Sequence, residues 1–248
     1  AYERARHEAF EQINVDLIAG MMGETEANWQ RNIERVLELR PDSVTIYQME
    51  IPYNTTIYKE MEAAGRAEAP IADWATKRRW VKEGFAALES AGYHVGSGYT
   101  AVLRPERTRF LYRDALWSGA DLLGLGVASF SHAAGVHYQN LTEIGPYSEA
   151  IRRGELPLNR AYRTNAEERM IREFILQMKL GRVDAGYFRE KFGADILGRF
   201  RSELEGLEGE GLLSLEGGMV VLSRDGLLCV DNLLHDFFLP HHRTNKLV

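Results

Sequence analysis

The chain has 248 residues, of which 45% are hydrophobic and 27% are charged, an ordinary globular composition for one large domain or two smaller ones. Its net charge of −6 disfavours nucleic acids and anionic membranes as main partners, and no apolar run approaches the roughly 20 residues that span a bilayer. The single cysteine, Cys229, excludes an internal disulfide framework and indicates a reducing compartment, so we expect a cytoplasmic protein.

The N-terminal part of the chain alternates between strand and helix patterns. Residues 13–20 form an apolar run that carries one acid, Asp16, and ends in a glycine. This pattern is typical of a parallel strand that is buried on both faces and opens onto a ligand at its carboxyl end. An amphipathic helix over 26–40 and a strand over 43–50 follow. Together the three elements predict a parallel βαβ unit.

Further elements of the same kind continue to residue 140. They are a short helix over 57–64, a long amphipathic helix over 72–92, a strand over 93–103 and a second glycine-bearing apolar run over 121–128. We expect this second run to be the last strand of an open α/β barrel. In such barrels the binding residues collect at the carboxyl ends of the strands. Residues 1–140 are therefore predicted to be one part of a barrel.

The pattern changes after residue 140. Helices are predicted over 146–154, 165–180, 184–192 and 195–210, then a hairpin over 212–222 and a last helix over 224–238. Thr164 is the expected cap of the second helix. Helices followed by a hairpin predict a helical, winged-helix-like domain over 141–248, with a loosely ordered tail from His241. Residues 164–248 carry 11 Lys and Arg against 14 Asp and Glu, which is unfavourable for contacts with phosphates.

Six segments recur in the same order in one known family. They are residues 13–20, 42–50, 90–93, 121–131, 136–140 and 222–228. In this the chain resembles the oxygen-independent coproporphyrinogen III oxidases and their relatives, which are radical S-adenosylmethionine (SAM) enzymes. The resemblance covers essentially the whole chain. It implies an α/β fold, namely the C-terminal part of an open partial (β/α) radical SAM barrel followed by a helical winged-helix-like domain.

The family holds a [4Fe-4S] cluster on a Cys-x3-Cys-x2-Cys loop that this sequence lacks. Three thiolates must bind three irons so that the fourth iron is free for SAM, and Cys229 alone cannot supply them. The resemblance therefore implies that SAM and the cluster belong to a longer parent enzyme, whose N-terminal half of the barrel is the missing partner. This chain alone would then be inactive. A natural cluster-less relative that binds haem or porphyrin is the alternative.

The resemblance also implies four cofactor-binding residues. Asp16 matches a family aspartate that lines the SAM site, and Phe130 falls where the family has an apolar residue against the adenine. Met49 and Glu50 lie at the end of the next strand, where a backbone contact to the adenine and a polar contact are expected. The structural alternatives are a turn cap for Asp16, barrel packing for Phe130 and a salt bridge for Glu50. No catalytic residue is assigned.

Two aromatic residues and two histidines are further candidates. Tyr47 and Tyr99 would stack against a large aromatic substrate, or else pack with satisfied hydroxyls. His132 and His137 lie five residues apart without a third ligand, so the sequence predicts no metal site. These histidines are instead candidates for contacts with the carboxylates of a substrate.

A basic run follows the predicted strand over 93–103. It consists of Arg104, Arg107, Arg109 and Arg113. Such a run is either a solvated loop or a clamp for an acidic substrate.

The resulting hypothesis is 5′-deoxyadenosyl radical chemistry on a tetrapyrrole or another large substrate. Oxidative decarboxylation and C-methylation are the two outcomes, because residues 50–56 differ from what the strict decarboxylase would carry. The rival hypotheses are the cluster-less haem- or porphyrin-binding relative and a non-enzymatic winged-helix binding module. A small-molecule substrate is expected, without nucleic acid or membrane partners.

Overall fold

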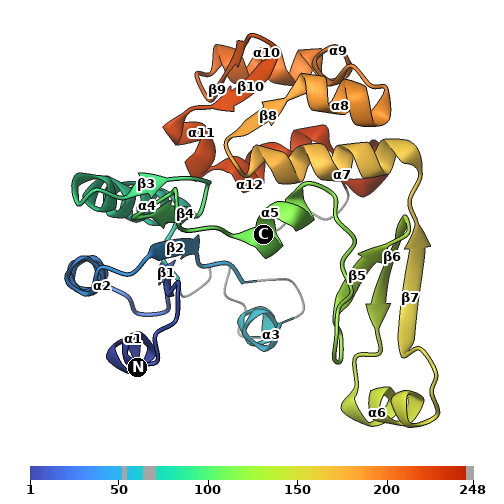
Figure 1. Cartoon of the computed structure of the whole chain (residues 1–248), viewed down its shortest axis with the longest axis horizontal. Helices are drawn as coiled ribbons and strands as arrows, with labels where there is room; N and C mark the ends of the chain where they lie inside the picture. Colours follow the sequence, from blue (N-terminus) through green and yellow to red (C-terminus); the bar gives the residue numbers. More distant parts are fainter. Residues whose placement is uncertain (52–54, 64–70, 244–248) are drawn as a thin grey trace.

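The computed structural model describes residues 1–51, 55–63 and 71–243, so three residues of segment 50–56 and the tail beyond residue 243 lie outside the description. The described residues form an α/β structure with three small open sheets (Figure 1). The α/β class is confirmed, but none of these sheets closes into a barrel. None of the helices described is long and apolar enough to cross a membrane.

The N-terminal sheet has four strands in the order β1 (Asn14–Ala19), β2 (Ser43–Gln48), β4 (Thr100–Val102) and β3 (His94–Val95). Strands β1 and β2 are parallel and are joined by helix α2 (Glu26–Leu39), which confirms the predicted βαβ unit. The single strand expected over 93–103 is wrong, because β3 and β4 form an antiparallel hairpin. A hydrogen bond of 2.7 Å between the hydroxyl groups of Ser97 and Thr100 closes the turn of this hairpin.

Helices α2 and α4 (Trp74–Ser90) pack on one face of this sheet and build its core. Trp29 and Trp80 stack with ring centroids 6.1 Å apart, and the Trp29 indole N–H donates to the Trp80 carbonyl oxygen at 3.0 Å. A Cβ at Gly84 would lie 3.0 Å from Ile33 Cδ1, so the glycine lets the two helices approach closely. The apolar faces of the two predicted amphipathic helices thus pack into one shared core.

The opposite face of β1 is open, which corrects the expectation that this strand is buried on both faces. Asn14, Asp16 and Ile18 are exposed, while Ala19 is buried against the helices. This alternation arises because side chains point to opposite faces along a strand and the described helices cover only one of them. The open face is where the candidate site lies.

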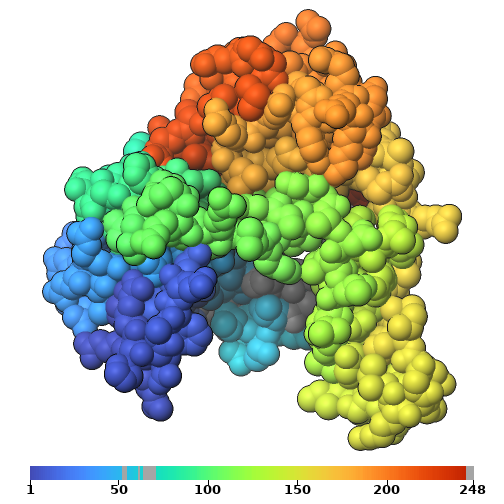
Figure 2. Space-filling view, viewed as in Figure 1, coloured from blue at the N-terminus to red at the C-terminus, as the bar shows by residue number. Residues whose placement is uncertain are grey.

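A second, antiparallel sheet consists of β5 (Phe130–Ala133), β6 (Val136–Asn140) and β7 (Leu158–Arg163). Figure 2 shows this sheet and helix α6 (Ile144–Arg152) projecting from the rest of the molecule. The predicted domain boundary after residue 140 falls inside this sheet, because β6 pairs with β7. The division at that residue stays a prediction.

The strand expected over 121–128 is absent. Only Leu122 forms a bridge, to His132, and the remainder is loop and turn. Leu123 and Leu125 are 68% and 88% exposed, so these two side chains join neither hydrophobic core of the described residues. A strand needs a neighbouring strand along its length to satisfy its backbone hydrogen-bonding groups. Among the described residues, this segment has a single bridge, which is too little for a strand.

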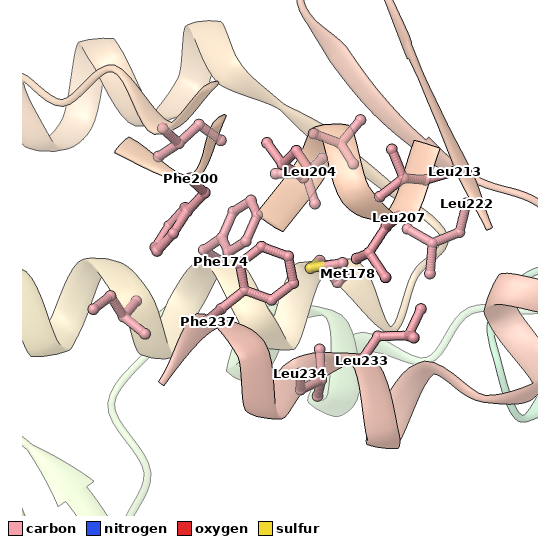
Figure 3. Close-up of a cluster of buried hydrophobic side chains, with 14 of the residues drawn as sticks. Phe174, Met178, Phe200, Leu204, Leu207, Leu213, Leu222, Leu233, Leu234 and Phe237 are labelled. Atoms are coloured by element: carbon pink, nitrogen blue, oxygen red, sulfur yellow. The ribbon is translucent and has the colours of Figure 1, made fainter. Parts of the chain in front are cut away.

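Residues 166–222 contain four helices and a third sheet. The helices are α7 (Ala166–Met178), α8 (Ala185–Phe192), α9 (Ile196–Arg199) and α10 (Arg201–Gly209), and the strands are β8 (Arg182–Asp184), β9 (Leu213–Glu216) and β10 (Met219–Leu222). Figure 3 shows Phe174, Phe200 and Phe237 meeting in their core, with Phe174 and Phe200 stacked at 4.9 Å. The cap of α7 is Asn165 and not Thr164. Assignment to the winged-helix fold stays a prediction.

The helix predicted over 224–238 is broken into three short segments: α11 (Arg224–Leu228), α12 (Val230–Leu233) and η1 (Leu234–Phe237). The break lets Leu228 enter the core of the N-terminal sheet, where Gln48 donates to its carbonyl oxygen at 3.0 Å. The C-terminal region therefore packs on the sheet. The remaining elements are α1 (Tyr2–His7), α3 (Thr56–Ala63), α5 (Leu111–Trp117) and η2 (Pro240–His242).

Candidate functional site

A cleft of about 900 Å³ lies on the open face of the N-terminal sheet. Its walls come from β1 and β2, from the start of α4, from α5, and from α7 with the α11–α12 segment. The volume falls within the roughly 300–1,000 Å³ of typical small-molecule sites. Because these elements lie far apart in the chain, the cleft exists only through the packing of the C-terminal region on the sheet.

The lining of the cleft includes acidic groups. Asp16 projects from the middle of β1, and its carboxylate accepts from the Asn14 amide at 2.6 Å. Glu50, two residues beyond β2, lines the same cleft. Desolvation raises the pKa of Glu50, and the negative charge of Asp231 adds to this effect while Lys77 opposes it. The structure thus brings Asp16 and Glu50 together in one cavity.

The second wall is a network around Tyr99. The Tyr99 hydroxyl donates to Asp231 at 2.6 Å, and Lys179 pairs with the other oxygen of Asp231 at 2.7 Å. Burial and the charge of Asp231 raise the pKa of Tyr99, so the phenol remains protonated. Its ring lies 6.1 Å from that of Tyr47 and 6.2 Å from that of Trp117. Tyr99 therefore has a satisfied hydroxyl. Tyr47 also lines the cleft, and its side chain is 45% exposed.

Of the basic run, Arg113 lines the cleft. Its guanidinium lies 4.4 Å from the Phe110 ring centroid and donates to the Thr100 hydroxyl at 3.0 Å. Arg104 instead pairs at 3.2 Å with buried Asp42, the residue that precedes β2. The four arginines are therefore not a single clamp. Arg113 is the member of the run that lines the cleft, and its guanidinium also pairs with Asp114 at 2.7 Å.

Lys77 is a buried residue that sequence reasoning missed. Its side chain is 1% exposed, and its ammonium donates to the Met49 carbonyl oxygen at 2.8 Å and lies 3.6 Å from the Trp74 ring centroid. The Met49 N–H donates to Ala19 at 2.8 Å, so the Met49 backbone groups are already engaged within the protein. The signal was a lysine on the apolar stripe of α4, three residues from Trp74 and Trp80.

Residues 165–229 match the family described as HemN C-terminal domain. The chain is also 25% identical over 248 residues to an oxygen-independent coproporphyrinogen III oxidase of Helicobacter pylori, a match that covers 94% of this chain and 53% of that protein.

Two further similar proteins extend the likeness beyond residues 165–229. The heme chaperone HemW of Bacillus subtilis is 25% identical over 231 residues, covering 92% of this chain and 59% of the relative. The solved structure of coproporphyrinogen III oxidase (HemN) from Escherichia coli, a radical SAM enzyme, matches with a TM-score of 0.75 and 21% identity over 95% of this chain and 57% of that one. The resemblance predicted from the sequence is confirmed. The chain spans about half the length of the curated relatives it matches.

Phe130 does not line the cleft on the open face of the N-terminal sheet. It sits at the start of β5 in the second sheet, 46% exposed, with its ring stacked on His137 at 5.4 Å and Arg160 over its other side. The cleft lining does not include it, so the structure does not bring Asp16 and Phe130 to one cavity. A contact between Phe130 and adenine stays a prediction.

His132 and His137 face each other across β5 and β6 in the same sheet. Burial lowers the pKa of both rings, and the positive charge of Arg172 lowers it further. The Nδ1 atom of His132 is buried and has no hydrogen-bond partner among the described residues. Neutral imidazoles beside arginines suit an anionic group, so a carboxylate contact remains their predicted role.

The residues present do not fit an iron–sulfur cluster. Cys229 is the sequence's one cysteine, and its thiol donates to the Asp225 carbonyl oxygen at 3.2 Å. Burial raises the pKa of this thiol, which disfavours the thiolate that iron requires. The polar groups of Asp16 and Glu50, by contrast, suit the amino and hydroxyl groups of SAM.

Proposed function

We propose that this chain is part of a coproporphyrinogen III oxidase-like radical SAM enzyme and binds SAM and a tetrapyrrole, or another large acidic substrate, in the cleft described above. The supporting observation is the composition of that cleft, whose lining combines aromatic rings, the cations Arg113 and Lys179 and the carboxylates Asp16 and Glu50. Flat conjugated rings with carboxylate side groups suit the aromatic rings and the cations, and the amino and ribose groups of SAM suit the carboxylates.

In this proposal each part of the cleft has a separate task. Asp16 and Glu50 accept hydrogen bonds from SAM, and Arg113 and Lys179 meet the carboxylates of the substrate. Tyr47 and Trp117 supply ring faces, and Tyr99 holds Asp231 in place. SAM supplies a 5′-deoxyadenosyl group when bound. No catalytic residue is proposed, because the observed contacts concern binding and orientation.

The thiolates for a cluster have to come from outside this sequence, since Cys229 is its one cysteine. We propose that the open N-terminal sheet is one segment of a radical SAM barrel, completed by a further polypeptide segment along β1. Among the described strands, β1 pairs with β2 alone, so its other edge is available for a further strand. We further propose that 141–248 is the winged-helix-like cover of this barrel.

The reaction outcome supported by the relatives is oxidative decarboxylation, because several of them are named oxygen-independent coproporphyrinogen III oxidases. C-methylation and inactivity of this chain alone receive no support from these names. A second candidate, haem or porphyrin binding without radical chemistry, is favoured by the match to the heme chaperone HemW. Cytoplasmic location stays a prediction from the cysteine content.

Binding titrations test the proposal directly on this chain. Coproporphyrin III should quench the fluorescence of Trp74 and Trp117, which line the cleft. Arg113→Met should raise the coproporphyrin Kd about tenfold or more, the effect of losing one hydrogen bond to a charged group. The matched control is Arg153→Met, an exposed arginine paired with Glu155, which should leave the Kd unchanged.

Three outcomes separate the candidates. Binding of both SAM and coproporphyrin III, measured separately by calorimetry, supports the enzyme proposal. Haem binding with a Soret shift but no SAM binding favours the HemW-like alternative. Coproporphyrin binding that is equally strong in the Arg113 and Arg153 variants would refute the proposed cleft.

A further inference from the structure

Three potential metal ligands meet at the beginning of α7, away from the cleft. Glu168 lies in the first turn of the helix, and His241 and His242 belong to η2, more than seventy residues later in the chain. The ligand atoms of the three side chains all lie within 4.8 Å of one another. The His242 and His241 Nε2 atoms lie 3.1 and 3.6 Å from the same carboxylate oxygen, Glu168 Oε1.

The Glu168 carboxylate is held in place by its neighbours. It is 6% exposed, its Oε2 accepts from the Asn165 N–H at 2.8 Å, and its Oε1 accepts from the Tyr162 hydroxyl at 2.5 Å. These two hydrogen bonds fix the orientation of the carboxylate, as the hydrogen-bond partners of metal-binding carboxylates do.

One of the two imidazoles is hydrogen-bonded to the carboxylate. A carboxylate oxygen has two lone pairs, and the partners of Oε1 are the Tyr162 hydroxyl and His242 Nε2. His241 Nε2, at 3.6 Å from the same oxygen, lies just beyond hydrogen-bond distance. A cation placed among the three groups would replace the His242 hydrogen bond and bind Oε1 and the Nε2 atoms of both histidines.

The spacing also fits a metal ion. Tetrahedral zinc with ligands at about 2.0–2.2 Å has ligand atoms roughly 3.3–3.5 Å apart. The two Oε1–Nε2 separations of 3.1 and 3.6 Å bracket that value. Both histidines are exposed, so solvent can reach the site and supply a fourth ligand.

We propose that Glu168, His241 and His242 form a binding site for one divalent transition metal ion of the zinc, cobalt or nickel class. Two imidazoles and one carboxylate are ligands that these ions accept. Tyr162 orients the carboxylate from β7. The ion would tie η2 to the start of α7 and to the end of β7. This inference is independent of the proposed cleft function.

Calorimetric titration of the metal-free full chain with Zn²⁺, followed by Co²⁺ spectroscopy, tests the site. We expect one ion per chain, with a Co²⁺ spectrum that shows nitrogen and oxygen ligands. His241→Ala and His242→Ala should each weaken binding more than tenfold, and Tyr162→Phe should weaken it about tenfold through loss of orientation. His94→Ala, at an exposed histidine in β3, is the matched control and should bind normally.

Glu168→Gln removes the carboxylate charge while glutamine still serves a capping box, so the helix start should persist and Zn²⁺ binding should fall more than tenfold. Thermal melting checks that each variant is folded. The inference is overturned if folded wild-type chain binds no Zn²⁺. It is also overturned if His242→Ala binds as tightly as wild type, or if Co²⁺ shows a thiolate charge-transfer band, which would place the ion at Cys229.

Discussion

Replacement of Lys77 tests whether the buried link beneath the cleft stabilises the fold. The Lys77 stem passes Gly20, where an added Cβ would lie 2.6 Å from Lys77 Cγ and Cδ, and the ammonium ends on the Met49 carbonyl oxygen. We compare Lys77→Ala, which removes both the stem and the charge, with Lys77→Met, which keeps most of the stem. Lys82 on the same helix is exposed and pairs with Asp225, so Lys82→Ala is the control.

The expected magnitudes follow from these contacts. Lys77→Ala loses three buried methylenes at about 0.8 kcal/mol each and a charge-assisted hydrogen bond worth about 1.5–3 kcal/mol. Burial lowers the pKa of Lys77, so the mutation also removes an unfavourable desolvation of the ammonium, which offsets part of the loss. We expect a decrease of about 3 kcal/mol in the free energy of unfolding for Lys77→Ala and of about 1–2 kcal/mol for Lys77→Met.

Urea denaturation at neutral pH, followed by tryptophan fluorescence, measures these changes. Lys82→Ala should cost less than about 0.5 kcal/mol, because it loses an exposed ion pair. The reasoning fails if Lys77→Ala and Lys82→Ala are equally stable. If Lys77→Met is as unstable as Lys77→Ala, the hydrogen bond and not the packed stem carries the effect.

Three further predictions concern binding and pH. Asp16→Ala should weaken SAM binding by about 1–3 kcal/mol if a charged hydrogen bond is lost, and an unchanged Kd in calorimetry would count against the assignment. The full chain should not bind duplex DNA at low salt, since the C-terminal region carries more acidic than basic residues; micromolar binding that weakens steeply with salt in anisotropy titrations would promote the binding-module hypothesis. Glu168 has a pKa of about 2, below the ordinary value of 4.5, so its contribution to stability is fully present above pH 4.5 and is lost as the pH falls toward 2. Glu168→Gln should therefore flatten the acid limb of stability measured by urea unfolding between pH 5 and 3, and an unchanged slope would contradict the role of this carboxylate.

Local patterns determined much of the fold. The βαβ unit follows from the strand and helix periods of residues 13–50 and from Thr25, whose side chain caps α2. Most C-terminal helices also appear within a few residues of their predicted bounds. These features depend on neighbours close in sequence, so the sequence alone could predict them.

Where the pattern was ambiguous, tertiary contacts decided the outcome. The apolar run over 121–128 has the composition of a strand, but a strand also needs partners, and only Leu122 has one. The helix predicted over 224–238 breaks at Cys229, which lets Leu228 enter the core of the other region. Whether an apolar residue continues a regular element or leaves it depends on the surface it meets, and that surface lies elsewhere in the chain.

The candidate sites show the same division. The sequence and its family resemblance pointed to Asp16 and Glu50, and the structure places both in one cleft, whereas Phe130 belongs to another sheet. Lys77 was visible only as a charge on an apolar stripe, and the approach of His242 to Glu168 had no local signal. Periodicity reports which face of an element is buried. It carries no information on which distant side chain lies opposite, because that depends on how the packed elements are arranged in space.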